Sequence, residues 1–325
     1  FFVVNKSKLE HEFNQDIEGF HFYDVDFTFK NFLDGVKVGV VTNIRITHKS
    51  VGQTNEEWEQ NRLQFVKVNS IINKSQYKNY EIIVADTGSS EKNMVVIEDF
   101  CKGKDFIKLV KFDYYNFAQI NNEVVYEYIS KDTELLLFCN NDIELINDAI
   151  TKVVSVWMKN RKKVGTVGAR LHFGDNTVQH GGMLLWLKKE WLTEQGLSQI
   201  EISHYNLRQA YKHNQEGYHR IVGNTGAFLL VSKELFNQVG GFNPTYIECF
   251  EDAELNFSIL LEGKMNLFVS DAVAYHYESK TRDESDEKLS RLQQDYRERL
   301  FPFIGQALND EHKGRIIGQF INVIE

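Results

Sequence analysis

Three adjacent polar residues, Asn140, Asn141 and Asp142, follow the apolar run at 135–139 and could together hold a ligand. A buried strand that ends in polar side chains needs partners for them, because unpaired polar groups are costly to bury. A carboxylate at the end of a strand is also a suitable oxygen ligand for a hard divalent cation. The stretch therefore indicates a ligand site in which the Asp142 carboxylate faces the surface.

Other acids and a histidine stand at comparable positions. Asp86 ends a short apolar run, and His276 follows a later one. Asp252 lies at the start of a predicted helix, where an aspartate can be a cap, a dipole partner or a proton acceptor. Glu251 beside it adds like-charge repulsion, which favours proton uptake, and Glu254 about one turn further is a second candidate.

The elements around these residues decide whether they can meet, and the sequence predicts strands alternating with helices. Such alternation implies a parallel α/β sheet, in which ligands bind beyond the carboxyl ends of the strands. Asp86 and Asp142 would then face one crevice, and Asn147 would cap the third helix. The expected strands are 81–86, 106–112, 134–142 and 163–171, and the expected helices are 93–101, 117–130 and 146–160.

After residue 170 the pattern loosens into loops and short strands, with "HGGMLLW" and "GNTGAFLLV" as landmarks. A helix around 232–240 should stop at Gly240 and Gly241, because glycine readily adopts the backbone that ends a helix. Residues 250–276 predict a helix, a glycine stop and a strand. The remainder from Lys280 is charged and mostly helical.

Composition narrows the class of protein. Lys and Arg number 37 against 46 Asp and Glu, a formal net charge of −9, which argues against a general nucleic-acid binder. Three distant cysteines, Cys101, Cys139 and Cys249, lack metal-site spacing and predict buried free thiols in a reducing cytosol. No apolar run reaches the roughly 18 residues of a spanning helix, and no signal peptide is visible, so we expect a soluble protein.

An internal repeat relates residues 22–48 to residues 250–276 without gaps. Its apolar and glycine matches fit a shared helix-to-strand packing unit. Such a unit does not explain why Asp24 matches Asp252 near one end, or why a histidine ends both copies.

Seven motifs follow one another along the chain: "VADTGSS", "NFAQINN", "FCNND", "QHGG", "GNTGAFLLV", "GGFNPTYIECFEDAEL" and "HYESKTR". Their order resembles that of the family 2 nucleotide-sugar glycosyltransferases, and is most similar to a bacterial rhamnosyltransferase-like branch. The resemblance covers about residues 71–300. It implies an α/β, GT-A fold, in which a Rossmann-like, mostly parallel central sheet is flanked by helices. It also implies inverting transfer from a nucleotide-diphosphate sugar to a saccharide or lipid-linked saccharide in bacterial surface polysaccharide synthesis (capsule or O-antigen).

A divalent cation, Mn²⁺ or Mg²⁺, is the cofactor that the resemblance implies, since it would neutralise the diphosphate leaving group. Asp142 and His276 match the metal-binding positions, with a core histidine as the alternative for His276. Asn140 departs from the acid that is commoner at the first position of this motif, and it adds no charge.

The same resemblance assigns the other site residues. Asp252 matches the catalytic base, with Glu251 beside it and Glu254 as the fallback. Asp86 matches the acid that contacts the nucleotide base, with a helix N-cap as the alternative. A plain turn is the alternative for the "GNTG" motif. The remaining donor-binding positions are Asn116, Asn140, Asn141, Asn224, Thr225 and Gly226.

The front of the chain departs from the family pattern, because the strand that opens the family's domain is not found before residue 71. Residues 1–70 instead resemble the closing part of another glycosyltransferase domain. The expected division is therefore 1–70, a GT-A domain at 71–300 and a helical tail at 301–325. Either the chain is a fragment of a tandem enzyme, in which Asp24 and His48 are relics, or residues 36–50 form the first strand.

Two other functions fit parts of the pattern. A binding or scaffold module with a decayed transferase fold would explain the unusual front and Asn140. A nucleotidyltransferase shares the nucleotide and metal requirements, but the Gly-rich basic loop expected after its first strand is not visible. We favour the glycosyltransferase, as a cytoplasmic protein that can lie at the inner face of the cell membrane. Other domains of a longer enzyme are its expected partners.

Overall fold

The computed structural model describes residues 70–193, 196–210, 217–277 and 286–324. Almost all of them belong to one compact unit, Ile71–Glu325. The predictions for residues 1–69, including the repeat at 22–48 and the alternative first strand at 36–50, lie outside the described residues. Within the described part, no helix is both long and apolar enough to cross a bilayer.

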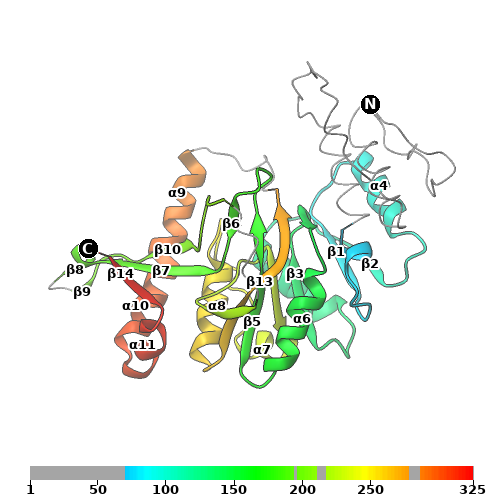
Figure 1. Ribbon diagram of the computed structural model, residues 1–325. Coiled ribbons are helices and arrows are strands. Elements are labelled where there is room, and N and C mark those ends of the chain that lie inside the picture. Colours follow the sequence, from blue (N-terminus) through cyan, green and yellow to red (C-terminus); the bar gives the residue numbers. More distant parts are fainter. Residues whose placement is uncertain (1–69, 194–195, 211–216, 278–285, 325) are drawn as a thin grey trace, which may run out of the picture. The chain divides into compact units, whose positions relative to one another are not determined.

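A seven-stranded central sheet has the order β11-β13-β5-β12-β3, with β4 paired to β13 and β6 paired to β5 (Figure 1). The α/β class is confirmed, but the expected mostly parallel pairing is wrong. Among the described strands of this sheet, only β13 and β5 pair in parallel, whereas β12 runs antiparallel to both β3 and β5. No helical crossover leads into β12, so nothing requires it to run parallel to its neighbours. The strands are β3 (Leu135–Cys139), β4 (Ile143–Leu145), β5 (Val164–His172), β6 (Val178–His180), β11 (Tyr218–Ile221), β12 (Phe228–Ser232) and β13 (Met265–His276).

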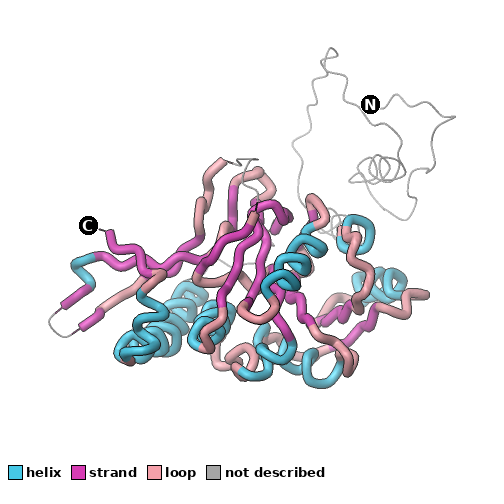
Figure 2. Tube along the Cα trace, turned by 60° about the horizontal axis from the view of Figure 1, so that its bottom comes forward, coloured by secondary structure: helices cyan, strands magenta, loops and turns pink. Residues whose placement is uncertain are grey.

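Helices cover both faces of this sheet (Figure 2), and strand alternation directs side chains to each. On β3, Leu135, Leu137 and Cys139 pack with α6, while Leu136 and Phe138 pack with α5, α7 and α8. Each face thus contributes its own apolar cluster to the core. The helices are α5 (Phe117–Glu123), α6 (Ala149–Asn160), α7 (Lys233–Gln238) and α8 (Glu251–Leu261).

Asn147 does not cap α6, so that prediction is wrong. Its Nδ2 donates to the Asp271 carbonyl (2.8 Å) and its Oδ1 accepts from the Val273 N–H (3.1 Å). The side chain therefore fastens the turn before α6 to β13. Asp148 precedes the helix, and its Oδ1 accepts from the Gln76 N–H (3.0 Å) rather than capping.

A smaller parallel sheet joins β1 (Ile82–Asp86) and β2 (Ile107–Lys111), which flank α4 (Glu91–Cys101) in sequence. The short helix α3 (Ile71–Lys74) precedes it. The helix α5 and its continuation η2 (Val124–Tyr128) pack between the two sheets. Ala118 and Val125 contact the β3 side, while Ile120 and Tyr128 contact β2. The predicted strands and helices between residues 81 and 130 are confirmed. Asp86 ends β1 of this smaller sheet, whereas Asp142 lies in the turn between β3 and β4 of the central sheet.

The chain's last elements pack on α8 through a cluster that includes Phe257, Leu300 and Ile304. The expected helical tail also contains a strand, β14, which pairs in parallel with β7 and extends away from the central sheet (Figure 1). These elements are α9 (Asp286–Asp295), η4 (Tyr296–Leu300), α10 (Phe301–Asn309), α11 (Glu311–Gly318) and β14 (Ile321–Ile324). The strands and turn beside them are β7 (Met183–Lys188), η3 (Lys189–Trp191), β8 (Leu192–Thr193), β9 (Gly196–Leu197) and β10 (Glu201–His204).

Candidate active site

Asp142 and His276 come together because β4 pairs with the end of β13. The antiparallel register places Ile143 opposite His276, so the preceding Asp142 lies beside the imidazole. Asp142 Oδ1 is 3.2 Å from His276 Nε2. The prediction of a surface-facing carboxylate is wrong, since Asp142 is 4% exposed and His276 7%. The strand pairing encloses both groups.

Gln179, on β6, fixes the orientation and the tautomer of His276. Its Nε2 donates to the His276 carbonyl (3.4 Å), which directs its Oε1 toward His276 Nδ1 at 2.6 Å. An amide oxygen only accepts hydrogen bonds, so Nδ1 carries the proton. The Nε2 atom is thus left to face Asp142 and the Asn140 Nδ2, which lies 3.3 Å away.

This pair fits a divalent cation. With the Nδ1 proton held by Gln179, the Nε2 lone pair of His276 would point at the Asp142 carboxylate oxygen. Two such acceptors repel each other unless a proton or a cation lies between them. The outer nitrogen of a metal-binding histidine is commonly held by a hydrogen-bond acceptor, as Gln179 holds it here. Within the described ranges no group of three or more His, Cys, Asp or Glu residues could hold a metal. A bound cation would therefore take its other ligands from substrate and water.

Cys139 ends β3 next to this pair but does not belong to the ligand set. Burial raises the pKa of its thiol to about 12, and the Asp142 carboxylate adds to the shift. Its Sγ donates to the Asn140 carbonyl (3.6 Å), and within the described residues it forms no three-ligand group with Asp142 and His276.

The loop 224–227 connects this cluster to α8. The Asn140 N–H donates to the Ala227 carbonyl (3.0 Å), and the Gly226 N–H donates to Asp252 Oδ2 (2.8 Å). A Cβ atom at Gly226 would lie 3.3 Å from the Phe117 ring and 3.5 Å from the Asp252 Cβ, so the backbone approaches both closely. One short loop thus touches the predicted metal site on one side and the predicted base on the other.

Asn224 holds this loop from inside the core. Its side chain is 0% exposed, and its Nδ2 donates to the Thr166 hydroxyl (3.0 Å) and the Leu267 carbonyl (3.1 Å). Asn256 Oδ1 accepts from the Asn224 N–H (3.1 Å), while Asn256 Nδ2 donates to the Asn224 carbonyl (2.8 Å). This burial favours a positioning role for Asn224. Gly226 is buried as well, and Thr225 between them is partly exposed.

Replacing Asn256 by alanine should lower the free energy of unfolding by about 2–4 kcal/mol. The change removes partners from Asn224 and from the Thr166 hydroxyl, and each buried unpaired group costs about 1–3 kcal/mol. Urea denaturation measures the loss. Asn160→Ala is the control, because the Asn160 side chain, at the end of α6, makes a single hydrogen bond among the described contacts, to the Val156 carbonyl. Equal losses for the two variants would contradict this account of the network.

Asp252 lies in the first turn of α8 but does not cap it, because its Oδ2 accepts from Gly226 in another element. Its carboxylate is partly exposed. Glu251 precedes it as the first residue of the helix. Glu254 accepts from the Tyr246 hydroxyl (2.6 Å) and from Asn243 Nδ2 (3.0 Å), so both its oxygens are engaged. Asp252 therefore remains the better candidate for a proton acceptor.

Among the other predicted donor-binding residues, Asp86 makes local contacts, whereas Asn116 makes both local and long-range ones. Asp86 accepts from the backbone of Gly88 and Ser89 at 3.3 Å, whereas Ser90 caps α4. Asn116 caps α5 by accepting from the Gln119 N–H (2.8 Å), and its Nδ2 donates to the Pro244 carbonyl (3.2 Å). Asn141 is exposed beside Asp142. Their roles in donor binding stay predictions.

The sequence reasoning did not assign roles to Gln179 or Asn256. Gln179 stands in the "QHGG" motif, which was singled out only as part of an ordered series. Asn256 interrupts the apolar stripe of a helix, and that is the signal that could have pointed to a buried polar network.

The described unit has the GT-A glycosyltransferase fold. A solved structure of GalNAc-T7 with UDP, GalNAc and Mn²⁺ matches it with a TM-score of 0.52 at 16% identity, covering 71% of this chain and 44% of that chain. The chain belongs to glycosyl transferase family 2, whose model matches residues 65–240. The match includes Asp142 and the loop 224–227, and it ends before Asp252 and His276.

Two curated relatives are much longer than this chain. An uncharacterized protein, y4gI of Sinorhizobium fredii, is 30% identical over 234 residues, which are 70% of this chain and 24% of the relative. The O-antigen biosynthesis protein RfbC of Myxococcus xanthus is 24% identical over 221 residues, or 66% of this chain and 16% of the relative. The chain thus spans a quarter or less of the length of these relatives.

Proposed function

We propose that the protein is an inverting, metal-dependent glycosyltransferase that uses a nucleotide-diphosphate sugar. The observation that carries the proposal is the pair of contacts made by the loop 224–227. One contact reaches Asn140, beside Asp142 and His276, and the other reaches Asp252. A sugar lying against this loop would have its leaving group on the side of Asp142 and its attacking hydroxyl on the side of Asp252.

Asp142 and His276 would hold the cation, Mn²⁺ or Mg²⁺, with Gln179 fixing the imidazole. When bound, the cation supplies charge neutralisation for the diphosphate leaving group. Asn140 can donate a hydrogen bond to a phosphate or ribose oxygen without adding charge. Asp86 and Asn116 are proposed to contact the nucleotide, and Asn141, Thr225 and Gly226 the donor sugar.

Asp252 would accept the proton of the acceptor hydroxyl as that oxygen attacks the anomeric carbon. Its Oδ2 is held by the Gly226 N–H at 2.8 Å, which orients the carboxylate relative to the loop. A positioned base of this kind contributes roughly 10²- to 10⁴-fold to rate. Attack from the side opposite the leaving group inverts the anomeric centre, and the nucleoside diphosphate is released.

The proposed setting is bacterial surface polysaccharide synthesis on a saccharide or lipid-linked saccharide acceptor. The printed name of the Myxococcus xanthus relative, an O-antigen biosynthesis protein, supports it. The low coverage of the relatives supports a place within a longer enzyme. A cytoplasmic position at the inner membrane face, the rhamnosyltransferase-like branch and a preceding transferase domain are further parts of the proposal.

A thermal-shift screen of nucleotide-diphosphate sugars, with and without Mn²⁺, tests the donor side of this proposal. One donor should raise the unfolding temperature in Mn²⁺ and lose most of that effect in EDTA. An unchanged unfolding temperature with every donor, while the protein is folded, would contradict it. Stabilisation by nucleoside triphosphates alone would favour a nucleotidyltransferase.

Gln179→Leu should weaken Mn²⁺ binding by about 10- to 100-fold, because a metal-binding histidine loses the group that orients it. Isothermal titration of Mn²⁺ in the presence of nucleoside diphosphate measures the change. Gln238→Leu is the control, since Gln238 bonds only Glu262 among the described contacts of its side chain. Equal Mn²⁺ affinity in Gln179→Leu and the wild type would remove Gln179 from the site.

A further inference from the structure

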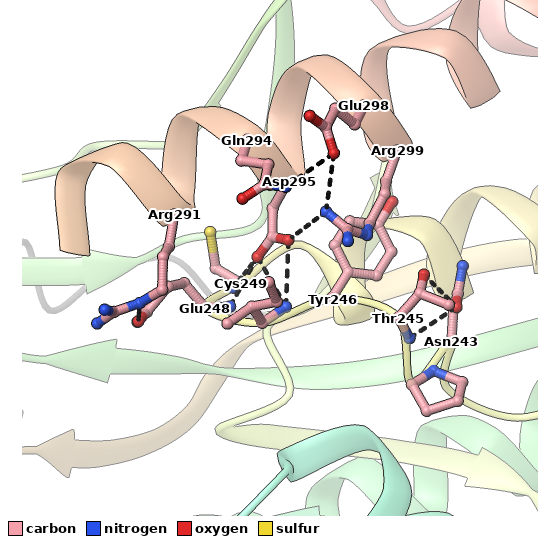
Figure 3. Close-up of polar contacts among 12 residues, drawn as sticks. Asn243, Thr245, Tyr246, Glu248, Cys249, Arg291, Gln294, Asp295, Glu298 and Arg299 are labelled. Atoms are coloured by element: carbon pink, nitrogen blue, oxygen red, sulfur yellow. Dashed lines mark hydrogen bonds and ion pairs between the residues drawn. The ribbon is translucent and has the colours of Figure 1, made fainter. Parts of the chain in front are cut away.

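Asp295 holds the loop that leads into α8. It is the last residue of α9 and its side chain is 0% exposed. Its Oδ2 accepts from three successive backbone N–H groups, those of Ile247 (2.9 Å), Glu248 (2.6 Å) and Cys249 (3.3 Å). Figure 3 shows this carboxylate reaching from the helix to the loop backbone. Three backbone N–H groups of a segment without regular structure thus donate to one buried carboxylate.

Neighbouring side chains strengthen this connection. Arg299 Nη1 donates to Asp295 Oδ1 (2.9 Å), which balances the buried charge, and Arg291 Nε donates to Glu248 Oε1 (2.5 Å). At the start of the loop, the Tyr246 hydroxyl donates to Glu254 within α8. Burial, followed by the contact with Glu254, raises the pKa of Tyr246, so it remains a donor at neutral pH. The loop is fastened both to α8 and to the last helices of the chain.

The loop needs such support because of how it ends. Phe250, just before α8, has a φ of +80°, in the left-handed region that non-glycine residues seldom occupy. A backbone of this kind persists only where its surroundings impose it. No side chain caps the first turn of α8 at this position. The placement of that turn, and of Asp252 within it, therefore depends on the loop 246–250.

From these contacts we infer that Asp295 is a positioning residue for glycosyl transfer, acting through the loop 246–250 on Asp252. The inference rests on the proposed function, because it takes Asp252 as the base. A carboxylate is required rather than an amide. If an NH₂ group replaced Oδ2 it would face backbone donors, and if it replaced Oδ1 it would face Arg299.

Asp295→Asn should therefore slow single-turnover transfer by about 10- to 100-fold, the scale expected when a reacting group is displaced by about 1 Å. The donor dissociation constant in Mn²⁺ should stay within about twofold, because Asp142 directly precedes β4 and His276 ends β13. Glu298→Gln is the matched control. It removes a carboxylate from the adjacent η4 that is exposed and lies 4.0 Å from Arg299, and it should keep the wild-type rate.

Hydrogen exchange provides a readout that does not depend on activity. In Asp295→Asn the amides of Ile247–Cys249 should exchange faster, while the amides of β3 should exchange as in the wild type. If this variant does not fold, Arg299→Met is measured instead, because it removes the charged partner of Asp295. It should show the same exchange pattern and slow transfer by at least about threefold, less than Asp295→Asn does.

The outcomes separate this inference from the proposed function when Asp252→Asn is measured in parallel. Slow transfer by both Asp295→Asn and Asp252→Asn, with donor affinity retained, supports the inference. A wild-type rate in Asp295→Asn, with slow transfer by Asp252→Asn, overturns it and leaves the function standing. An equal loss of donor affinity and rate in Asp295→Asn also overturns it. A wild-type rate in Asp252→Asn overturns the assigned base and this inference together.

Discussion

Replacing Asp252 by asparagine should slow glycosyl transfer by about 10²- to 10⁴-fold, since the amide cannot take the proton of the acceptor hydroxyl. The remaining amide oxygen can still accept from the Gly226 N–H, so the loop 224–227 should keep its position. Donor affinity should hardly change, because the proposed cation lies with Asp142 and His276. Single-turnover rates at saturating donor and acceptor, together with the donor dissociation constant, measure both effects.

Two further variants make this comparison specific. Glu262→Gln, just past the other end of α8, removes a surface carboxylate that accepts only from Gln238 among its described contacts, and it should transfer at the wild-type rate. Glu254→Gln disturbs the contacts with Tyr246 and Asn243. If Asp252→Asn kept the wild-type rate while Glu254→Gln lost it, the base would be Glu254.

Asp142→Ala should weaken Mn²⁺-supported donor binding by more than about 100-fold. Even the outer partners of metal ligands typically change metal affinity by about 10- to 100-fold, and Asp142 would be a ligand itself. The carboxylate lies 3.2 Å from His276 Nε2, so the change removes one of the two proposed protein ligands of the cation. Titration of donor with and without Mn²⁺ measures the loss.

A control on the same pair of strands separates metal binding from general damage. Asp271→Ala removes a half-exposed carboxylate on β13 that pairs with Lys152 at 2.6 Å, and it should leave donor affinity in Mn²⁺ unchanged. The unfolding temperatures of both variants in EDTA report on folding without metal. Wild-type donor affinity in Asp142→Ala would remove this residue from the donor site.

Much of the fold could be predicted because local patterns were strong. The apolar runs that became β1, β2 and β3 were visible in the sequence, and so was the helix, glycine and strand series from α8 to β13. Gly240, Gly241 and Gly263 all have positive φ, as expected for residues that end helices. Strand direction was not predictable, since β12 takes its place between β3 and β5 only in the folded chain.

Long-range partners account for what the sequence did not reveal at the site. Asn147 was expected to be a cap, yet its polar atoms bond backbone groups at Asp271 and Val273. Asp142 was expected at the surface, but the pairing of β4 with β13 buries it. Asp295 gave no signal at all, because its partners are main-chain N–H groups of a distant loop that any residue could supply. Side-chain types identified the candidate residues, but their contacts depended on the fold.

The most direct test of the account is the product formed from a nucleotide-diphosphate sugar in the presence of Mn²⁺. The donor chosen is the one that stabilises the protein in the thermal-shift screen, and products are identified by mass spectrometry and by the NMR signal of the anomeric proton. We predict release of the nucleoside diphosphate and a glycoside of inverted anomeric configuration, with both lost in EDTA and in Asp142→Ala. Pyrophosphate as the product, a retained anomeric configuration, or tight donor binding without any turnover would contradict it.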